Sequence, residues 1–200
     1  MKKIGLLLLA TVIVAVVITG LKLKKPGMDA TGPGMKDGIL IVNDFNEGVS
    51  DSNLLGAWNK DPLDKTQGCS MEYAEPGFDG TGKCLKISYD VDSPNPAYNG
   101  FYLKLNGLDA RRAGKISFWI KGDEKAYPKK FKMEVKNANE ASPYYIVTAT
   151  GEWQEIEIPL TEFPLITDWS SMQEFVLVFE DMQTKPKTGA IYLDTISFKQ

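Results

Sequence analysis

Beyond residue 38, the chain consists of short segments in which apolar and polar residues alternate, separated by turns rich in Gly, Pro and Asn. In the clearest of them, residues 151–163 (GEWQEIEIPLTEF), two isoleucines alternate with two glutamates until Pro159 ends the run. A period of two residues is typical of a strand with one packed face, and proline has no N–H to donate to a neighbouring strand. We find no convincing amphipathic helix in this part of the sequence, apart from a turn or two near residues 108–113 or 161–163. The pattern predicts an all-β domain.

About ten such segments give the expected strands of this domain. Short strands separated by Gly, Pro and Asn turns are typical of a sandwich or barrel built from two antiparallel sheets. The stretch NLLGAWNKDP, residues 53–62, is predicted to be a loop. The expected strands are residues 39–44, 69–74, 84–91, 97–105, 115–121, 131–136, 144–150, 153–158, 174–180 and 190–198.

A hydrophobic leader occupies residues 1–23. An apolar run from Ile4 to Leu21 follows two lysines, and its length is near the lower limit for a helix that spans a bilayer. No Ala-x-Ala cleavage site follows the run, although Gly20 is a small residue of the kind that precedes a cleavage point. The leader is therefore either an uncleaved N-terminal transmembrane anchor or a cleaved signal peptide, and the missing motif favours the anchor.

The leader is followed by a spacer and then by one domain. Residues 24–38 (KKPGMDATGPGMKDG) contain prolines and glycines without apolar periodicity, which predicts a flexible linker. Residues 39–200 are enough for one domain of ordinary size with a full core. Lysines lie on both sides of the leader, so positive charge does not determine its orientation in a membrane.

The composition excludes several classes of function. The chain has no histidine, two cysteines and a net charge of −3. The lack of histidine excludes Ser-His-Asp and Cys-His catalysis and zinc sites with histidine ligands, and two cysteines are too few for a cysteine metal site. The small negative charge, with Arg111 and Arg112 as the one arginine doublet, provides no general attraction to nucleic acid. We therefore expect no nucleic-acid partner.

The two cysteines, Cys69 and Cys84, are predicted to lie on neighbouring strands. After export to an oxidising compartment they would form a disulfide, and closing that loop would stabilise the domain by roughly 3 kcal/mol. The alternative is that both remain free thiols.

Several stretches, taken in order, resemble one family of domains. NDFNEG followed by NLLGAW resembles the "Asp-Phe-Glu … Asn-x-x-Gly-Gly" opening of jelly-roll domains related to the family 11 carbohydrate-binding modules. Residues 82–123 resemble their next three strands, residues 151–163 match their "Trp-Gln-x-(Val/Ile)-x-Ile-Pro-Leu-x-x-Phe" segment, and GAIYLDTISF resembles their closing strand. Related galactose-binding-like folds, including domains of the complex I intermediate-associated protein 30 type, share single motifs. The order and spacing of the motifs together, over residues 39–198, are more specific.

The resemblance implies a jelly-roll β-sandwich that binds a polysaccharide, often a β-glucan, without cleaving it. In such domains the opening and closing strands often hold a structural calcium ion, and Asp44 and Asp194 lie at the matching positions. This sequence has Asn46 where the family has Glu, with Glu47 one place later. The expected calcium ligands are therefore Asp44, Glu47 and Asp194, with loop carbonyl groups. The alternative is that these acidic residues cap turns or lie in solvent.

A sugar-binding face needs flat aromatic rings and polar groups that bind hydroxyls. Tyr102 is the leading candidate, because it alternates with Phe101 and Leu103 on the strand that lines the cleft in the family. The adjacent Tyr144 and Tyr145 must point to opposite faces, and burial in the core is the alternative for every aromatic candidate. The predicted ligand residues are Tyr98, Tyr102, Tyr144, Tyr145, Trp169, Asn99 and Lys104, with Asp92 and Asp168 as further polar candidates.

Three other tryptophans receive different assignments. Trp119 and Trp153 are predicted to lie in the core or at its edge, and Trp58 lies in the segment that matches the Gly-Gly opening, with its role left open.

We therefore predict a non-catalytic, monomeric polysaccharide-binding domain on the outer side of the cytoplasmic membrane, in the periplasm or on the cell surface. It would be tethered to the membrane by its leader or secreted. The alternative function is a protein-interaction or scaffold module on the same fold. Glycoside hydrolysis would need two carboxylates that flank a cleft, and the sequence shows no pair with the required spacing, so we expect no enzymatic activity.

Overall fold

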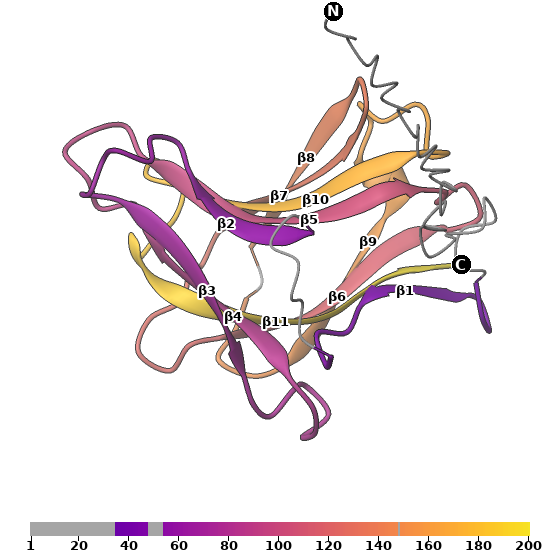
Figure 1. The fold of residues 1–200 in the computed structure, drawn as a ribbon, viewed down its shortest axis with the longest axis horizontal. Helices are drawn as coiled ribbons and strands as arrows, with labels where there is room; N and C mark the ends of the chain where they lie inside the picture. Colours follow the sequence, from indigo (N-terminus) through magenta and orange to yellow (C-terminus); the bar gives the residue numbers. More distant parts are fainter. Residues whose placement is uncertain (1–34, 48–53, 148) are drawn as a thin grey trace, which may run out of the picture. The chain divides into compact units, whose positions relative to one another are not determined.

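In a computed structural model of the chain, residues 35–47, 54–147 and 149–200 are described (Figure 1). They belong to one compact unit, Thr31–Gln200. The predicted leader and residues 24–34 of the predicted spacer lie outside the described residues. Among the residues that are described, no helix is both long enough and apolar enough to cross a bilayer.

Two layers of strands face each other (Figure 1). The six-stranded sheet has the order β3-β4-β11-β6-β9 with β1 beside β11, and the five-stranded sheet has the order β2-β5-β10-β7-β8. The paired strands are antiparallel, so the predicted two-sheet antiparallel sandwich is confirmed. The strands are β1 (Ile39–Asn43), β2 (Leu55–Asn59), β3 (Gly68–Ala74), β4 (Cys84–Asp90), β5 (Tyr98–Leu108), β6 (Lys115–Gly122), β7 (Phe131–Asn137), β8 (Ala141–Ile146), β9 (Gln154–Pro159), β10 (Met172–Glu180) and β11 (Thr188–Lys199).

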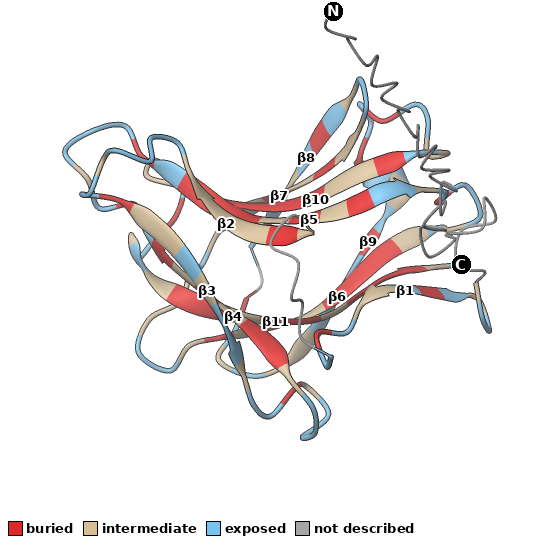
Figure 2. Cartoon of the chain, in the orientation of Figure 1, coloured by how far each residue is buried: buried red, intermediate tan, exposed pale blue. Residues whose placement is uncertain are grey.

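The core lies between the two sheets and is filled by side chains at alternate positions of both inner faces. Figure 2 marks the buried residues along the strands of both sheets. On β5, Phe101 and Leu103 are buried, whereas Tyr102 between them is half-buried on the outer face. The rings of Phe118 on β6 and Phe175 on β10 meet edge to face across the core, with centroids 5.5 Å apart. Burying one such side chain stabilises the domain by about 1.5–3 kcal/mol. The face of each strand that carries these side chains therefore turns inward, and the other face is left on the outside.

The closing strand β11 changes partners along its length. Its first half, from Thr188, pairs with β4 and its end, to Lys199, pairs with β1, while β6 lies along its other side. The register shifts between Asp194 and Ser197, and Thr195 has a positive φ of 35°. This irregularity places Asp194 at the junction of β4, β1 and β6.

Some elements differ from the sequence-based expectations. β2 (Leu55–Asn59) is a strand where a loop was expected. It is held as a strand by pairing with β5, which is distant in the sequence, and a short segment that contains glycine gives no local sign of that pairing. β8 (Ala141–Ile146) begins before the expected residue 144 and contains Pro143, which an edge strand tolerates. A 3-10 helix, Leu160–Glu162, occupies one of the two expected helical turns.

The predicted disulfide is wrong: Cys69 and Cys84 are both free. They do lie on neighbouring strands, but Cys69 of β3 is opposite Tyr89 and Cys84 of β4 is opposite Ala74. Their positions along the two paired strands differ by five residues, which at a rise of about 3.3 Å per residue is far beyond the roughly 7 Å that a disulfide can bridge. Burial raises the pKa of the Cys69 thiol to about 12, so it is a structural rather than a reactive thiol.

Candidate functional site

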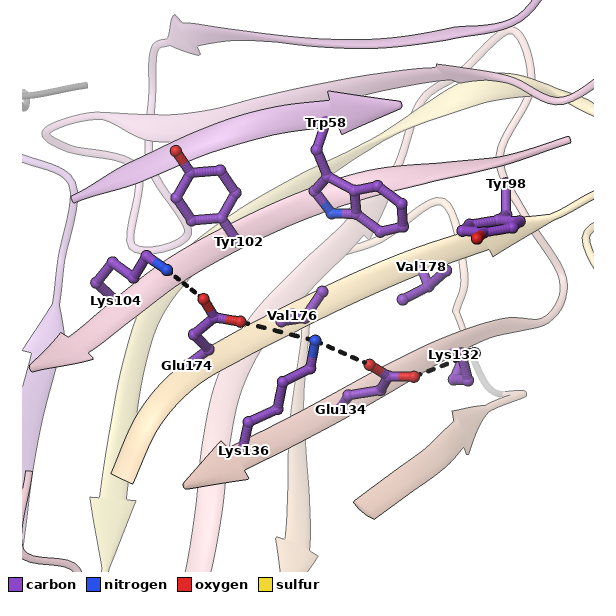
Figure 3. Close-up of a pocket in the computed structure, with 10 residues that line it drawn as sticks. All are labelled: Trp58, Tyr98, Tyr102, Lys104, Lys132, Glu134, Lys136, Glu174, Val176 and Val178. Atoms are coloured by element: carbon purple, nitrogen blue, oxygen red, sulfur yellow. Dashed lines mark hydrogen bonds and ion pairs between the residues drawn. The ribbon is translucent and has the colours of Figure 1, made fainter. Parts of the chain in front are cut away.

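The outer face of the five-stranded sheet contains a cleft with a volume of 470 Å³ (Figure 3). Three strands of the sheet and one side chain of the edge strand β2 form its walls. Two valines of the central strand β10 form its floor. The lining residues are Trp58, Tyr98, Tyr102, Lys104, Lys132, Glu134, Lys136, Glu174, Val176 and Val178.

The strand register brings these residues together. Glu174 of β10 lies opposite Lys104 of β5 on one side and Lys136 of β7 on the other. Two residues further along β10, Val176 lies opposite Tyr102 and Glu134 in the same way. Because alternate residues of a strand face the same side, the outward positions of three strands form rows that cross the sheet.

Aromatic rings line the β5 side of the cleft. Trp58 and Tyr98 meet edge to face with centroids 5.8 Å apart and an interplanar angle of 66°. The Tyr102 ring lies against β2 at Gly56, where a Cβ atom would come within 2.9 Å of the tyrosine oxygen. A residue larger than glycine at position 56 would therefore displace the ring. Along the cleft, the Trp58 ring lies between those of Tyr102 and Tyr98 (Figure 3).

Charged side chains of alternating sign line the other side, beginning with Glu174. Its carboxylate forms an ion pair with Lys104 and a second ion pair with Lys136, at 3.6 Å. The Lys104 ammonium also lies 5.3 Å from the centroid of the Tyr102 ring, a cation–π distance. Glu174 therefore links the aromatic side of the cleft to β7.

The series continues along β7. Glu134 pairs with Lys136 at 3.4 Å and with Lys132 at 3.1 Å, and Lys132 pairs with Glu180 at 3.0 Å. The Tyr145 hydroxyl donates a hydrogen bond of 3.2 Å to Glu180. We name the six residues Lys104, Glu174, Lys136, Glu134, Lys132 and Glu180 the charge ladder; three are positive and three negative.

The surroundings shift the pKa of two groups along the ladder, Lys132 and the neighbouring Tyr145. Burial alone would lower the pKa of Lys132, but the hydrogen bonds to Glu180 and Glu134 outweigh it and raise that pKa. Burial, and then the Glu180 charge, raise the pKa of Tyr145, so its hydroxyl remains a donor. The charges cancel, and what the cleft offers a ligand is a set of fixed ammonium donors and carboxylate acceptors beside aromatic rings.

Three predicted ligand residues, Tyr98, Tyr102 and Lys104, line the cleft. Tyr145 lies on β8 at the end of the ladder, with its side chain exposed. The structure therefore brings these four residues onto one face.

The other predicted ligand residues lie elsewhere. Asn99 is fully buried, and its amide donates to the Asp90 carbonyl, because residue 99 has inward parity on β5. Tyr144 faces the core, where its ring contacts Phe163. Trp169 contacts the same phenylalanine in a separate hollow of 320 Å³, between the β5–β6 and β9–β10 connections. Of the further polar candidates, the Asp92 carboxylate pairs with Lys187 at 3.6 Å and Asp168 accepts from the Ser170 N–H, outside the cleft.

Sequence reasoning missed most of the ladder. Lys132, Glu134 and Lys136 alternate with apolar residues, which is typical of the solvent-exposed side of a strand, but nothing local places that side next to Tyr102. Glu174 and the valines of β10 gave no signal, because their role depends on β10 lying between β5 and β7.

The predicted calcium ligands are not gathered into one group. Within the described ranges, no three acidic or cysteine side chains lie close enough together to hold a metal ion. Asp44 instead accepts a hydrogen bond from the Asn46 N–H at 3.2 Å. Asp194 is buried, and its carboxylate accepts from the N–H groups of Phe78, at 3.0 Å, and Thr195, at 2.7 Å.

Oxygen atoms nevertheless converge beside Asp194. A Cβ atom at Gly77 would lie 2.7 Å from Asp194 Oδ2, 2.6 Å from the Thr81 carbonyl oxygen and 3.4 Å from that of Lys83. Burial is the main reason why the pKa of Asp194 is raised. One buried carboxylate with two carbonyl groups supplies only part of the six to eight oxygen ligands that calcium takes. Of the three predicted acidic ligands, only Asp194 lies beside these carbonyl groups. Calcium binding therefore stays a prediction.

Trp119 and Trp153, which were expected in the core or at its edge, lie on the outer side of the six-stranded sheet. Trp119 and Trp153 are half-buried at the outer face of this sheet and are absent from the core cluster of buried residues. Phe78 stacks on Trp119, with centroids 4.4 Å apart. Trp153 meets Tyr192 edge to face at 6.4 Å.

Comparison with known proteins gives one family. Residues 29–178 match the model of the family described as "Carbohydrate binding domain (family 11)". No curated protein shows a significant match to the chain.

Several solved structures share the fold. One is a family 11 carbohydrate-binding module from Clostridium thermocellum in complex with a β-1,3-1,4-mixed-linked tetrasaccharide, at 21% identity and a TM-score of 0.64, with 82% of this chain and 97% of that chain covered. Another is the family 11 module of the cellulosomal cellulase Lic26A-Cel5E of the same organism, at 22% identity and a TM-score of 0.62, with 82% and 96% covered. A third is an exo-β-agarase, at 15% identity and a TM-score of 0.59, of which 25% is covered. At these identities the likeness establishes the jelly-roll sandwich.

Proposed function

Because this chain belongs to the family 11 carbohydrate-binding domains, we propose that it binds a β-glucan chain in the cleft of the five-stranded sheet and does not cleave it. The observation that carries the proposal is the cleft itself, where three aromatic rings lie beside the charge ladder. Aromatic faces suit the C–H side of a pyranose ring, and the ladder offers donors and acceptors to its hydroxyl groups. The glucan class is taken from the similar module whose complex contains a mixed-linked tetrasaccharide.

The cleft favours sugar over protein as the ligand. A protein-binding face would show a broad apolar patch without polar partners, whereas here Val176 and Val178 are enclosed by charged and aromatic side chains. Absence of cleavage is consistent with the ladder, since Glu134 and Glu174 are both held in ion pairs with lysines. We further propose that the domain works as a monomer outside the cytoplasm, attached to the membrane by residues 1–23 or released from it.

Affinity electrophoresis of the full-length protein, in a detergent without a sugar head group, tests the function. We expect retardation in gels that contain soluble β-1,3-1,4-glucan. Tyr102→Ala and Trp58→Ala should each cost about 1 kcal/mol, roughly a fivefold loss of affinity, without lowering the melting temperature. Tyr73→Ala, on β3 of the other sheet, is the matched control and should bind like the wild type. Lack of retention by every polysaccharide, together with a specific protein partner in pull-downs, would support the interaction-module alternative instead.

A further inference from the structure

A second aromatic site lies on the opposite face of the sandwich, outside the six-stranded sheet. It is a hollow of 140 Å³ beside the rings of Trp153 and Tyr192. Both side chains are half-buried, so each ring keeps an exposed part. The lining residues are Ala74, Glu75, Pro76, Lys121, Trp153 and Tyr192.

The strand register explains this arrangement. Tyr192 of β11 lies opposite Lys86 of β4 and Lys121 of β6, all at outward positions. Trp153 directly precedes β9, the strand beyond β6. The outward rows of three neighbouring strands therefore put one tyrosine between two lysines, with a tryptophan beside them.

The Tyr192 ring is held in one orientation by charged groups. The ammonium groups of Lys86 and Lys121 lie 5.6 and 5.9 Å from its centroid. Its hydroxyl donates to Asp123 at 3.1 Å, and Lys86 pairs with the same carboxylate at 3.4 Å. Burial would raise the pKa of Asp123, but hydrogen bonds from the Lys125 N–H, Tyr192 and Lys86 outweigh it and lower that pKa. The carboxylate therefore stays charged and the ring stays fixed.

The second site repeats the chemistry of the cleft. In the cleft, Trp58 and Tyr98 meet at 5.8 Å and 66°, and Lys60 lies 5.2 Å from the Tyr98 centroid. On the opposite face, Trp153 and Tyr192 meet at 6.4 Å and 63°, with lysines over the tyrosine. An edge-to-face pair of this kind sets two rings at a steep angle, and the ammonium groups over the tyrosine ring are hydrogen-bond donors beside the exposed parts of both rings.

We propose that the hollow beside Trp153 and Tyr192 is a second carbohydrate-binding site, which takes a single sugar ring of a neutral glycan. This inference rests on the proposed function, because it assumes that the ligand class is the one bound in the cleft. The volume of 140 Å³ is below the usual range for pockets that enclose a whole ligand, so binding here is weaker than in the cleft. Since the sites lie on opposite outer faces of the sandwich, one domain can hold two glycan segments at once.

The test follows the indole N–H signals of full-length protein by NMR during titration with a β-1,3-1,4-linked glucotetraose. The signals of Trp58 and Trp153 are assigned from Trp58→Phe and Trp153→Phe. We expect the Trp58 signal to shift at low tetrasaccharide concentration and the Trp153 signal to shift at concentrations at least tenfold higher. In Trp58→Ala/Tyr102→Ala the Trp153 shift should persist.

Two variants probe the site directly. Trp153→Ala should reduce retention on insoluble β-glucan at least threefold while the titration of the Trp58 signal is unchanged. Lys121→Ala, which leaves both rings in place, should also weaken the Trp153 response, whereas Val147→Ala, at an exposed residue that does not line the hollow, should not.

The outcomes separate the two proposals. A Trp153 signal that does not move at any tetrasaccharide concentration overturns the second site, whether or not the cleft binds. If the Trp58 signal does not respond, the proposed function of the cleft is overturned. The second site is then decided separately by whether the Trp153 signal shifts. A Trp153 shift that disappears in the cleft variant also overturns the second site, because it would then report binding in the cleft.

Discussion

Trp58 and Trp119 lie on the outer faces of the two opposite sheets, yet one lines a cleft and the other is covered. Trp58 meets its aromatic neighbour Tyr98 at an edge, and the two rings line the cleft together with the charge ladder and the valines of β10. Over Trp119, Phe78 from the β3–β4 connection stacks at an interplanar angle of 16°, and the Phe78 N–H is held by Asp194. Both tryptophans point outward from their strands, so the difference in access comes from the β3–β4 connection, which covers Trp119 with Phe78.

The charged residues of the two faces differ in the same way. On the six-stranded sheet, Lys199 pairs with Glu155 and with Glu157, and Lys115 pairs with Glu157 at 2.8 Å. These pairs cross β11, β6 and β9 much as the charge ladder crosses β5, β10 and β7. Here they lie outside the cleft and the two hollows, so ion pairs alone do not make a binding face. In the cleft, the ion pairs lie beside three aromatic rings, and we propose that this combination binds the ligand.

The largest expected effect concerns the loop that covers Trp119. If calcium binds beside Asp194, it holds this loop, and removing it with a chelator should lower the stability by about 2.7 kcal/mol where free calcium was about a hundred times its dissociation constant. For a domain of this size that is a fall in melting temperature of several degrees, measured by calorimetry. Asp194→Asn should make the protein insensitive to the chelator. A wild-type melting temperature that the chelator does not change would remove the calcium site.

The next effect concerns the charge ladder. Glu174→Gln removes the carboxylate that pairs with both Lys104 and Lys136, and leaves the cleft with an excess positive charge. We expect β-glucan affinity to fall about tenfold, which corresponds to about 1.4 kcal/mol, because the lysines lose their fixed positions.

The control is Glu157→Gln on the other sheet, whose carboxylate likewise pairs with two lysines. It should leave affinity unchanged when measured in the same electrophoresis. Equal losses in both variants would mean that the ladder has no special part in binding.

A smaller effect should follow from uncovering Trp119. Phe78→Ala removes a stacked pair, which costs about 1 kcal/mol and lowers the denaturant midpoint. The Trp119 fluorescence should shift to longer wavelength, while affinity for β-glucan in the cleft stays the same. A change in cleft affinity would show that the two faces are not independent.

The smallest effect is a pH dependence of stability that comes from Glu140, a residue that lies in neither the cleft nor the second site. Glu140 accepts hydrogen bonds from the Thr167 hydroxyl, the Thr167 N–H and Asn137, and these lower its pKa from 4.5 to about 2. Because the folded-state pKa lies below the unfolded value, the stabilisation is complete above pH 4.5 and is lost as the pH falls towards 2.

Glu140→Gln should therefore lower the melting temperature slightly at about pH 7 and make the protein less sensitive to acid than the wild type between pH 4.5 and 2. Melting curves across this range measure the difference. An identical acid dependence in the two proteins would show that this carboxylate does not link the β7–β8 turn to the β9–β10 connection.

Alternation of apolar and polar residues along each strand determined much of this protein by itself. It predicted the two-sheet sandwich, the inward parity of Phe101 and Leu103 and the outward parity of Tyr102. The physical reason is local, since a strand has a period of two and its apolar side must be buried. The same parity rule, applied to residue 99, would have placed Asn99 in the interior beside Phe101.

Tertiary structure decided everything that depends on which strands are neighbours. The order β5-β10-β7 brings Tyr102, Glu174 and Glu134 to one cleft, and the register of β3 with β4 keeps Cys69 and Cys84 apart. Strand order and register result from pairing between distant segments, and the residues of one segment carry no record of the partner. The sequence thus determined which side chains point outward, and the pairing of strands determined which of them meet.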